Sequence, residues 1–294
     1  MKYIDKYLEY LKAIRKYSDK TILSYKDDLI EYQEFLCNNF TNMLEVKKET
    51  INKYLKYLYE RDLNKNSICR KLSSIRGLYN YLIREEIIID NPLNFVTNPK
   101  KEKYLPKFLN NSDMDKLFSI CEDNTPVEQR DSLIIELLYA TGLRVSELVN
   151  IKIKDINTKE RVIKVLGKGS KERIVIYNNH TSEALKKYLN DGYNDFNKKN
   201  TGYLILNKNG DKLSDRYIRN IIDKKIRKAG INTKISPHTL RHTFATDMLE
   251  QGADLVTVKE LLGHESLNTT SIYTHITNEQ IKKTYNMAHP RARK

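Results

Sequence analysis

The sequence has little cysteine and no long apolar run. Its three cysteines, Cys37, Cys69 and Cys121, are far apart, and none belongs to a Cys-x-x-Cys pair. The sequence therefore predicts neither a disulfide framework nor a zinc ribbon. No apolar stretch approaches the roughly 20 residues that a membrane span needs, and charged residues follow Met1 without a signal-peptide core. These absences exclude a disulfide-rich secreted domain and a membrane protein, and we expect a cytoplasmic protein.

Basic residues outnumber acidic ones, and they do so unevenly. The chain carries 52 Lys and Arg against 38 Asp and Glu, a formal net charge of +14. Residues 1–97 hold 17 basic and 14 acidic side chains, whereas residues 98–294 hold 35 and 24. Such a balance favours a polyanionic partner, above all nucleic acid. The second part of the chain is the stronger candidate for binding phosphate.

The sequence divides into a helical domain, a linker and a mixed domain. Apolar and tyrosine residues recur at helical spacing in four segments, 3–11, 22–36, 51–58 and 72–82. They predict a four-helix domain over residues 1–90. Residues 91–107 are rich in Asn, Lys and Pro, which indicates an extended linker. Residues 108–294 then form the second domain.

The predicted helices of the first domain have start signals, which are Thr21, Thr50 and Ser67 for the last three. In the second domain, helices are predicted at 112–121, 129–139, 146–150 and over most of 215–285. Residues 161–166 and 173–177 are rich in β-branched residues and flank a Gly-Lys-Gly turn, which predicts a hairpin. Residues 204–206 are a candidate third strand. We therefore predict a mainly α fold with a small antiparallel β-sheet.

Six residues of the second domain supply chemistry suited to a phosphodiester. They are Arg144, Lys168, His238, Arg241, His264 and Tyr273. Cationic groups can hold the phosphate, a proton donor can serve the leaving oxygen, and a phenol can attack phosphorus. This combination indicates chemistry on a phosphodiester.

Arg144 follows a Thr-Gly break between two predicted helices. A guanidinium at such a helix entrance can bind two phosphate oxygens, although taken alone it is equally well a surface arginine. Glu147 is close enough to fix Arg144, or it is simply an acid in the first helical turn. Lys168 lies between two glycines at the hairpin tip, and Lys171 in the same turn is its rival. The residues by themselves do not decide between these two lysines.

His238 and Arg241 are one helical turn apart and share a face. Ser236 suits the N-cap and Pro237 the first turn, so a positive helix N-terminus would favour phosphate here. His238 and His242 also have the spacing of a zinc-protease helix. No glutamate follows His238, however, and Arg241 would repel a metal ion. We therefore expect no metal.

His264 and Tyr273 complete the set. His264 follows Gly263 at an expected helix end, where it can bind a phosphate oxygen or simply cap the helix. Tyr273 is one of 20 tyrosines. A phenol with a pKa of about 10 is a poor nucleophile unless nearby cations stabilise the phenolate. The assignment of Tyr273 therefore depends on its place shortly after Gly263 and His264.

In order and local context these residues resemble the tyrosine recombinase (phage integrase) family, whose catalytic set is Arg, Lys, His-x-x-Arg, His and Tyr. The compact two-domain length, the Gly-Lys-Gly-Ser-Lys-Glu-Arg turn and the His-Pro-Arg-Ala ending are most similar to Xer-type recombinases. The resemblance implies an N-terminal SAM-like core-binding domain and a mixed α/β catalytic domain. It also implies that no cofactor, ATP or metal takes part.

The resemblance implies a mechanism as well. Tyr273 would attack to give a 3′-phosphotyrosine, Lys168 would protonate the 5′ oxygen, and His238 would assist as a base or hydrogen-bond partner. The residues implied to stabilise charge on the phosphate are Arg144, Arg241 and His264. Attack by a 5′-hydroxyl from a second duplex would then form a Holliday junction.

The implied partners are double-stranded DNA with a specific core site, a homo- or hetero-tetramer on two sites, and a partner recombinase or DNA translocase. The Xer-like role would be the resolution of chromosome or plasmid dimers, and so chromosome partition during cell division. A mobile-element integrase is the nearest alternative, ahead of a type IB topoisomerase-like enzyme and a non-catalytic DNA-binding protein. We predict that the segment beyond about Asn278 docks on a neighbouring protomer of that tetramer, while the sequence by itself equally allows it to pack back on its own domain or to fray.

Overall fold

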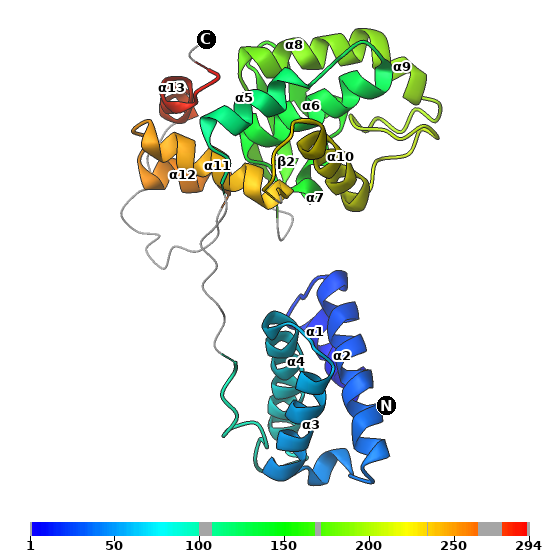
Figure 1. The fold of residues 1–294 in the computed structure, drawn as a ribbon. Coiled ribbons are helices and arrows are strands. Elements are labelled where there is room, and N and C mark those ends of the chain that lie inside the picture. Colours follow the sequence, from blue (N-terminus) through cyan, green and yellow to red (C-terminus); the bar gives the residue numbers. More distant parts are fainter. Residues whose placement is uncertain (1, 100–107, 168–171, 234, 264–277, 293–294) are drawn as a thin grey trace. The chain divides into compact units, whose positions relative to one another are not determined.

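A computed structural model describes residues 2–99, 108–167, 172–233, 235–263 and 278–292. The chain forms two compact units, Met1–Tyr104 and Leu105–Lys294, which are drawn in Figure 1. Each unit is described by itself below. In the parts of the chain that are described, no helix has the length and apolar character needed to cross a bilayer.

The first unit contains four helices, as the periodicity predicts. They are α1 (Lys2–Ala13), α2 (Asp19–Asn38), α3 (Lys48–Glu60) and α4 (Lys65–Arg84), with a short 3-10 helix, η1 (Met43–Glu45), before α3. Tyrosines fill much of the core: Tyr32 and Tyr79 are buried, and their hydroxyl oxygens lie 3.0 Å apart. Tyr79 also donates to the carbonyl of Met43 at 3.0 Å. Aromatic spacing in this unit therefore reflects packing.

All three predicted helix starts of the first unit are wrong by three residues. Ser18 caps α2 and accepts a hydrogen bond from the backbone N–H of Thr21, and Asn64 caps α4 and accepts from that of Ser67. A residue three positions after a cap is the donor that the cap satisfies. Both predicted residues are thus donors inside the first turn. Helix α3 starts at Lys48, and its N-cap, Lys47, lies three residues before the predicted Thr50 and makes no side-chain cap hydrogen bond.

The start of the predicted linker is packed on α4. Leu93 is buried in the core of the first unit, and the Asn91 amide donates to the backbone carbonyl of Arg76 at 3.2 Å. Arg76 in turn donates to the carbonyl of Val96 at 3.0 Å. Hydrogen bonds in both directions therefore hold the start of this segment on α4, although its composition indicated an extended linker.

The second unit is built around α6 (Pro126–Thr141), which is buried on nearly every side. Around it pack α8 (Asn179–Lys187), α10 (Asp215–Lys228) and α11 (Pro237–Glu250). Shorter helical elements of this unit are α5 (Asn111–Ser119), α7 (Val145–Leu148), η2 (Ile153–Asp155), the π-helix η4 (Tyr188–Gly192) and α9 (Tyr193–Phe196). The mainly helical fold class is confirmed for the described residues.

The sheet is antiparallel and small, with the order β1-β2-β3. Strands β2 (Val162–Leu166) and β3 (Glu172–Ile176) form the predicted hairpin, in a register that pairs Val165 with Arg173. The third strand is β1 (Ile156–Asn157), which directly precedes the hairpin. The prediction of a strand at 204–206 is wrong. Those residues are buried and form only an isolated bridge from Leu206 to Lys212, because their backbone pairs with irregular loops.

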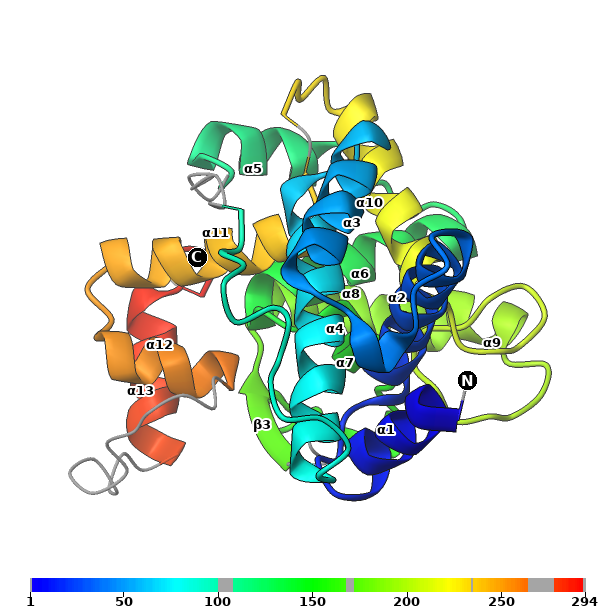
Figure 2. The same cartoon turned by 90° about the horizontal axis from the view of Figure 1, so that it is seen from below.

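Helices α12 (Leu255–Leu262) and α13 (Asn278–Ala288) pack beside α11, as Figure 2 shows. Tyr285 of α13 is fully buried and donates to the carbonyl of Ala140 at 2.9 Å. His289 is also fully buried: its Nδ1 accepts from the N–H of Arg291 at 3.2 Å, and its Nε2 lies 3.5 Å from the carbonyl of Tyr139. In this structure the segment beyond Asn278 packs on its own unit.

The buried imidazole predicts a pH dependence of stability. Burial lowers the pKa of His289 to about 4, whereas an unfolded histidine has a pKa of about 6.5. Between these values the unfolded chain binds a proton that the folded chain does not, so the contribution of His289 to stability falls as the pH drops. The loss reaches about 3 kcal/mol once the pH is near 4. Urea unfolding between pH 7.5 and 4.5 measures it.

A His289→Phe variant is the control for this prediction. It lacks the titrating group, so the difference in unfolding free energy between wild type and variant should shrink as the pH falls. Burial raises the pKa of Glu136 to about 7 and that of Asp247 to about 6, and these carboxyls have the opposite effect on stability. They are present in both proteins and largely cancel in the difference. A difference that stays constant across the range contradicts the assignment.

Candidate active site

Helix α11 begins as its sequence predicts. Ser236 is the N-cap and accepts from the N–H of Thr239 at 3.3 Å, and Pro237 occupies the first helical position. Proline fits there because its missing N–H would have no partner inside the helix. This start places His238 at an exposed position of the first turn and Arg241 one turn later in a buried position.

Arg241 joins the ends of two other helices. Its Nη1 donates to the carbonyl of Gly142 at 2.5 Å, and its Nη2 donates to the carbonyl of Leu262 at 2.6 Å. Gly142 ends α6 and Leu262 is the last residue of α12. Burial, together with the positive charges of Arg144 and Arg173, lowers the pKa of Arg241 to about 10. The guanidinium therefore stays charged at neutral pH, and carbonyls orient it without neutralising it.

Arg144 is the N-cap residue of α7, at the helix entrance that the Thr-Gly break predicts. Its backbone N–H donates to Oε2 of Glu147 at 2.8 Å, and its Nη1 donates to Oε1 at 2.9 Å. Burial opposes the charge of Glu147. The hydrogen bonds and charges of Arg173 and Arg144 outweigh it, so the pKa of Glu147 is lowered. Glu147 is thus ionised at neutral pH and holds Arg144.

A small pocket brings three of the six predicted residues together. Arg144, His238 and Arg241 line it, and the other lining residues come from the start of α10, the start of α11 and the segment Leu143–Ser146. Lys168, His264 and Tyr273 lie outside the described residues. The described chain stops one residue before each of the first two, at Gly167 and Gly263.

Arg173 is a site residue that the sequence analysis missed. Its Nη1 and Nη2 donate to the two oxygens of Glu147 at 2.7 and 3.0 Å. A signal for it was present: Arg173 alternates with Val175 and Tyr177, which are buried, and alternate strand residues share a face. An arginine on the buried face of a strand needs an acidic partner, and Glu147 provides it.

Gly263 is crowded by this arginine. Its φ of +65° lies in the left-handed region, which favours glycine. A Cβ at this position would lie 2.8 Å from Cδ of Arg173 and 2.9 Å from its Nε. Because two hydrogen bonds to Glu147 hold the guanidinium, the side chain cannot easily move aside. Glycine is therefore required here by both conformation and contact.

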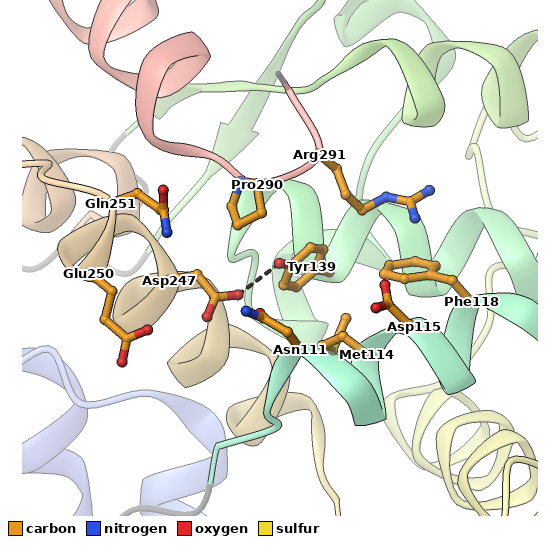
Figure 3. Close-up of a pocket in the computed structure, with 10 residues that line it drawn as sticks. All are labelled: Asn111, Met114, Asp115, Phe118, Tyr139, Asp247, Glu250, Gln251, Pro290 and Arg291. Atoms are coloured by element: carbon orange, nitrogen blue, oxygen red, sulfur yellow. Dashed lines mark hydrogen bonds between the residues drawn. The ribbon is translucent and has the colours of Figure 1, made fainter. Parts of the chain in front are cut away.

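The second unit also has a larger pocket, with a volume of about 430 Å³, whereas the pocket lined by Arg144 and Arg241 has a volume of about 100 Å³. Acidic side chains predominate among the charged residues that line the larger pocket. Figure 3 shows it between α5, α11 and the segment after α13, with Asp115, Asp247 and Glu250 in its lining. Asp247 accepts from the hydroxyl of Tyr139 at 2.7 Å. Carboxylates repel a phosphate, so the smaller pocket with its arginines is the better site for DNA chemistry.

The structure also describes His238 and His242, which have the spacing of a zinc-protease helix. His242 packs edge-on against the ring of Phe108, with ring centroids 6.4 Å apart. Within the ranges that the structure describes, no group of three or more His, Cys, Asp or Glu side chains is arranged to hold a metal ion.

Comparison with known proteins gives matches over nearly the whole chain. The profile described as "Phage integrase family" matches residues 107–280, and that described as "Phage integrase, N-terminal SAM-like domain" matches residues 4–86. Tyrosine recombinase XerC of Staphylococcus saprophyticus is 42% identical over 98% of this chain and 97% of its own length. XerC of Staphylococcus aureus strain JH9 is 43% identical over 98% and 96%.

Solved structures of a recombinase and an integrase are also similar to this chain. XerH recombinase bound to a palindromic difH substrate after cleavage is 25% identical, with a TM-score of 0.74 over 97% of this chain and 84% of that one. The Tn1549 transposon integrase in complex with circular intermediate DNA has a TM-score of 0.71 at 20% identity, over 96% and 98%. At that identity the second match shows the shared fold alone.

Proposed function

Because this chain belongs to the phage integrase family and is a Xer-like tyrosine site-specific recombinase, we propose that it cleaves a specific DNA core site with Tyr273 as the nucleophile. The observation that carries the proposal is the meeting of Arg144, His238 and Arg241 in one pocket. Arg144 is distant in the sequence from His238 and Arg241, and all three occupy positions that match the family's catalytic set. The near full-length XerC relatives favour this function over that of a mobile-element integrase.

The arginines would stabilise the charge that builds on the scissile phosphate. Arg241 is oriented by two carbonyls and Arg144 by Glu147. Donors that are fixed before the reaction need no reorganisation when charge develops, which is the main source of such catalysis. His264 would add a further hydrogen bond to a non-bridging oxygen.

The proposed reaction is an exchange of phosphodiester bonds. The phenol oxygen of Tyr273 forms a bond to phosphorus as the bond from phosphorus to the 5′ oxygen breaks. Lys168 gives its proton to that leaving oxygen, and His238 assists as a base or hydrogen-bond partner. The 3′-phosphotyrosine keeps the energy of the broken bond, so a 5′-hydroxyl from the second duplex can reverse the step and rejoin the strand.

The proposed substrate is double-stranded DNA with a core site, contacted by both units of the chain. Two such sites would be held by a tetramer of this protein, alone or with a second recombinase, and a DNA translocase would regulate the reaction. Resolution of chromosome or plasmid dimers is the role that we propose, through a Holliday junction. The XerH complex with DNA supports the DNA-binding part of this proposal.

Recovery of covalently trapped DNA tests the proposed function. The full chain is incubated with genomic fragments, denatured, and digested to leave peptide on the DNA ends, which are then sequenced. Ends that share one sequence, with Tyr273 in the attached peptide, are expected. Ends without a common sequence would instead indicate a relaxing enzyme of the topoisomerase type, and no adduct would indicate a non-catalytic DNA-binding protein.

A substrate with sulfur in place of the bridging 5′ oxygen can distinguish the roles of Lys168 and Lys171. Lys168→Ala should cut ordinary DNA slowly, because the 5′ oxygen leaves poorly without a proton. A substrate with sulfur at the bridging 5′ position needs no proton, so its cleavage should be restored to near the wild-type rate. Lys171→Ala is the matched control and should cut ordinary DNA normally. If sulfur rescues only Lys171→Ala, the two roles must be exchanged.

A further inference from the structure

Arg173 and Arg144 share the carboxylate of Glu147 unequally. Arg173 uses both of its terminal nitrogens on Glu147, whereas Arg144 donates only Nη1 from its side chain. The exposed fraction of the side chain is 32% for Arg144, 14% for Arg173 and 3% for Glu147. Arg173 thus lies behind the carboxylate, and Arg144 lies nearer the solvent side of the pocket.

The two hydrogen bonds from Arg173 to Glu147 limit how Glu147 can bind Arg144. A carboxylate beside a single arginine favours a fork with two parallel hydrogen bonds. Here Arg173 occupies that fork, so Arg144 keeps its remaining side-chain N–H groups for a ligand in the pocket that it lines with His238. Without Arg173, Glu147 would be free to form the fork with Arg144 and turn it away from that ligand.

Arg173 does not line the pocket, but it adds positive charge beside Arg144 and Arg241, which do. Arg144, Arg173 and Arg241 with the single carboxylate of Glu147 carry a formal charge of +2. The stem of Arg173 packs on Gly263 at the end of α12, and the carbonyl just before it, that of Leu262, accepts from Arg241. Arg173 therefore contacts both groups that orient the arginines of the proposed reaction: Glu147, which holds Arg144, and the end of α12, which holds Arg241.

We propose that Arg173 is a positioning residue for DNA cleavage, which holds Glu147 so that Arg144 faces the scissile phosphate and supports the end of α12 that orients Arg241. This inference rests on the proposed function. Arg173 acts through these neighbours and does not bind the phosphate itself, because its two terminal nitrogens are engaged by Glu147.

The test is single-turnover cleavage of a nicked suicide substrate by the full chain at saturating DNA. Arg173→Gln should lower the rate constant by about 30-fold to 100-fold, the size expected from a misplaced catalytic group, while the Kd for DNA changes less than about threefold. Arg173→Lys keeps the charge but cannot span both oxygens, and should recover part of the rate. Lys164→Gln removes a charge from the exposed Lys164–Glu172 pair on the same hairpin and should leave the rate constant unchanged.

The rate constant separates positioning from mere stability. A variant that only folds less well gives a smaller reaction amplitude at an unchanged rate constant. Adding Glu147→Gln removes the carboxylate that Arg173 restrains, so Arg173→Gln should slow the Glu147→Gln protein much less than it slows the wild type, with only the support of α12 left to lose. A wild-type rate constant for Arg173→Gln, or a loss confined to DNA affinity, overturns the inference. If the wild-type protein itself forms no adduct, the proposed function fails instead.

Discussion

Replacement of Tyr273 by phenylalanine is expected to abolish the covalent protein–DNA adduct, while the Kd for DNA stays within about threefold of wild type. The phenol oxygen is the proposed nucleophile and forms the bond to phosphorus. The grip on DNA comes from cationic groups elsewhere, so the loss of one oxygen should hardly change it. Trapping on a nicked suicide substrate, followed by denaturing electrophoresis, measures the adduct, and a mobility-shift titration measures the affinity.

Other tyrosines of the second unit serve as controls. Burial raises the pKa of Tyr285 and of Tyr139 well above the usual range, so neither phenol can readily supply a phenolate. Tyr217 is exposed on α10, and Tyr217→Phe should form the adduct as wild type does. An adduct that persists in Tyr273→Phe would show that a different tyrosine is the nucleophile.

Replacement of Arg241 by lysine is expected to lower the rate constant for cleavage by about 10²-fold to 10³-fold. The guanidinium reaches the carbonyls of Gly142 and Leu262 at once. A single ammonium group cannot reproduce that planar geometry, so one carbonyl loses its partner and the charge moves within the pocket. The buried carbonyl that is left without a hydrogen-bond donor should also lower the free energy of unfolding by about 1–3 kcal/mol.

Two measurements check this prediction. Single-turnover cleavage at saturating DNA gives the rate constant, and urea unfolding gives the stability. Arg227→Lys, an exposed arginine in the last turn of α10, is the matched control and should change neither quantity. Cleavage by Arg241→Lys at the wild-type rate would remove Arg241 from the proposed mechanism, whatever its stability.

Local patterns predicted several parts of the fold that depend on local interactions. The cap Ser236 and Pro237 at the start of α11 was predicted correctly, because capping involves only residues within one turn. The β2–β3 hairpin was also predicted, since its strands are adjacent in sequence. Strand β1 has only two residues, too few for a period to be read, and residues 204–206 have the apolar composition of a strand without its pairing.

The sequence by itself determined the residue types of the site, their order and the helix starts that carry two of them, because a motif and a cap are properties of neighbouring residues. Only the tertiary structure decided that Glu147 contacts Arg173, 26 positions later, and that Arg241 donates to the carbonyl of Gly142, 99 positions earlier. These bonds depend on how α6, α7, α11, α12 and β3 pack together. Periodicity reports which face of an element is buried, and it does not report which distant group that face will contact.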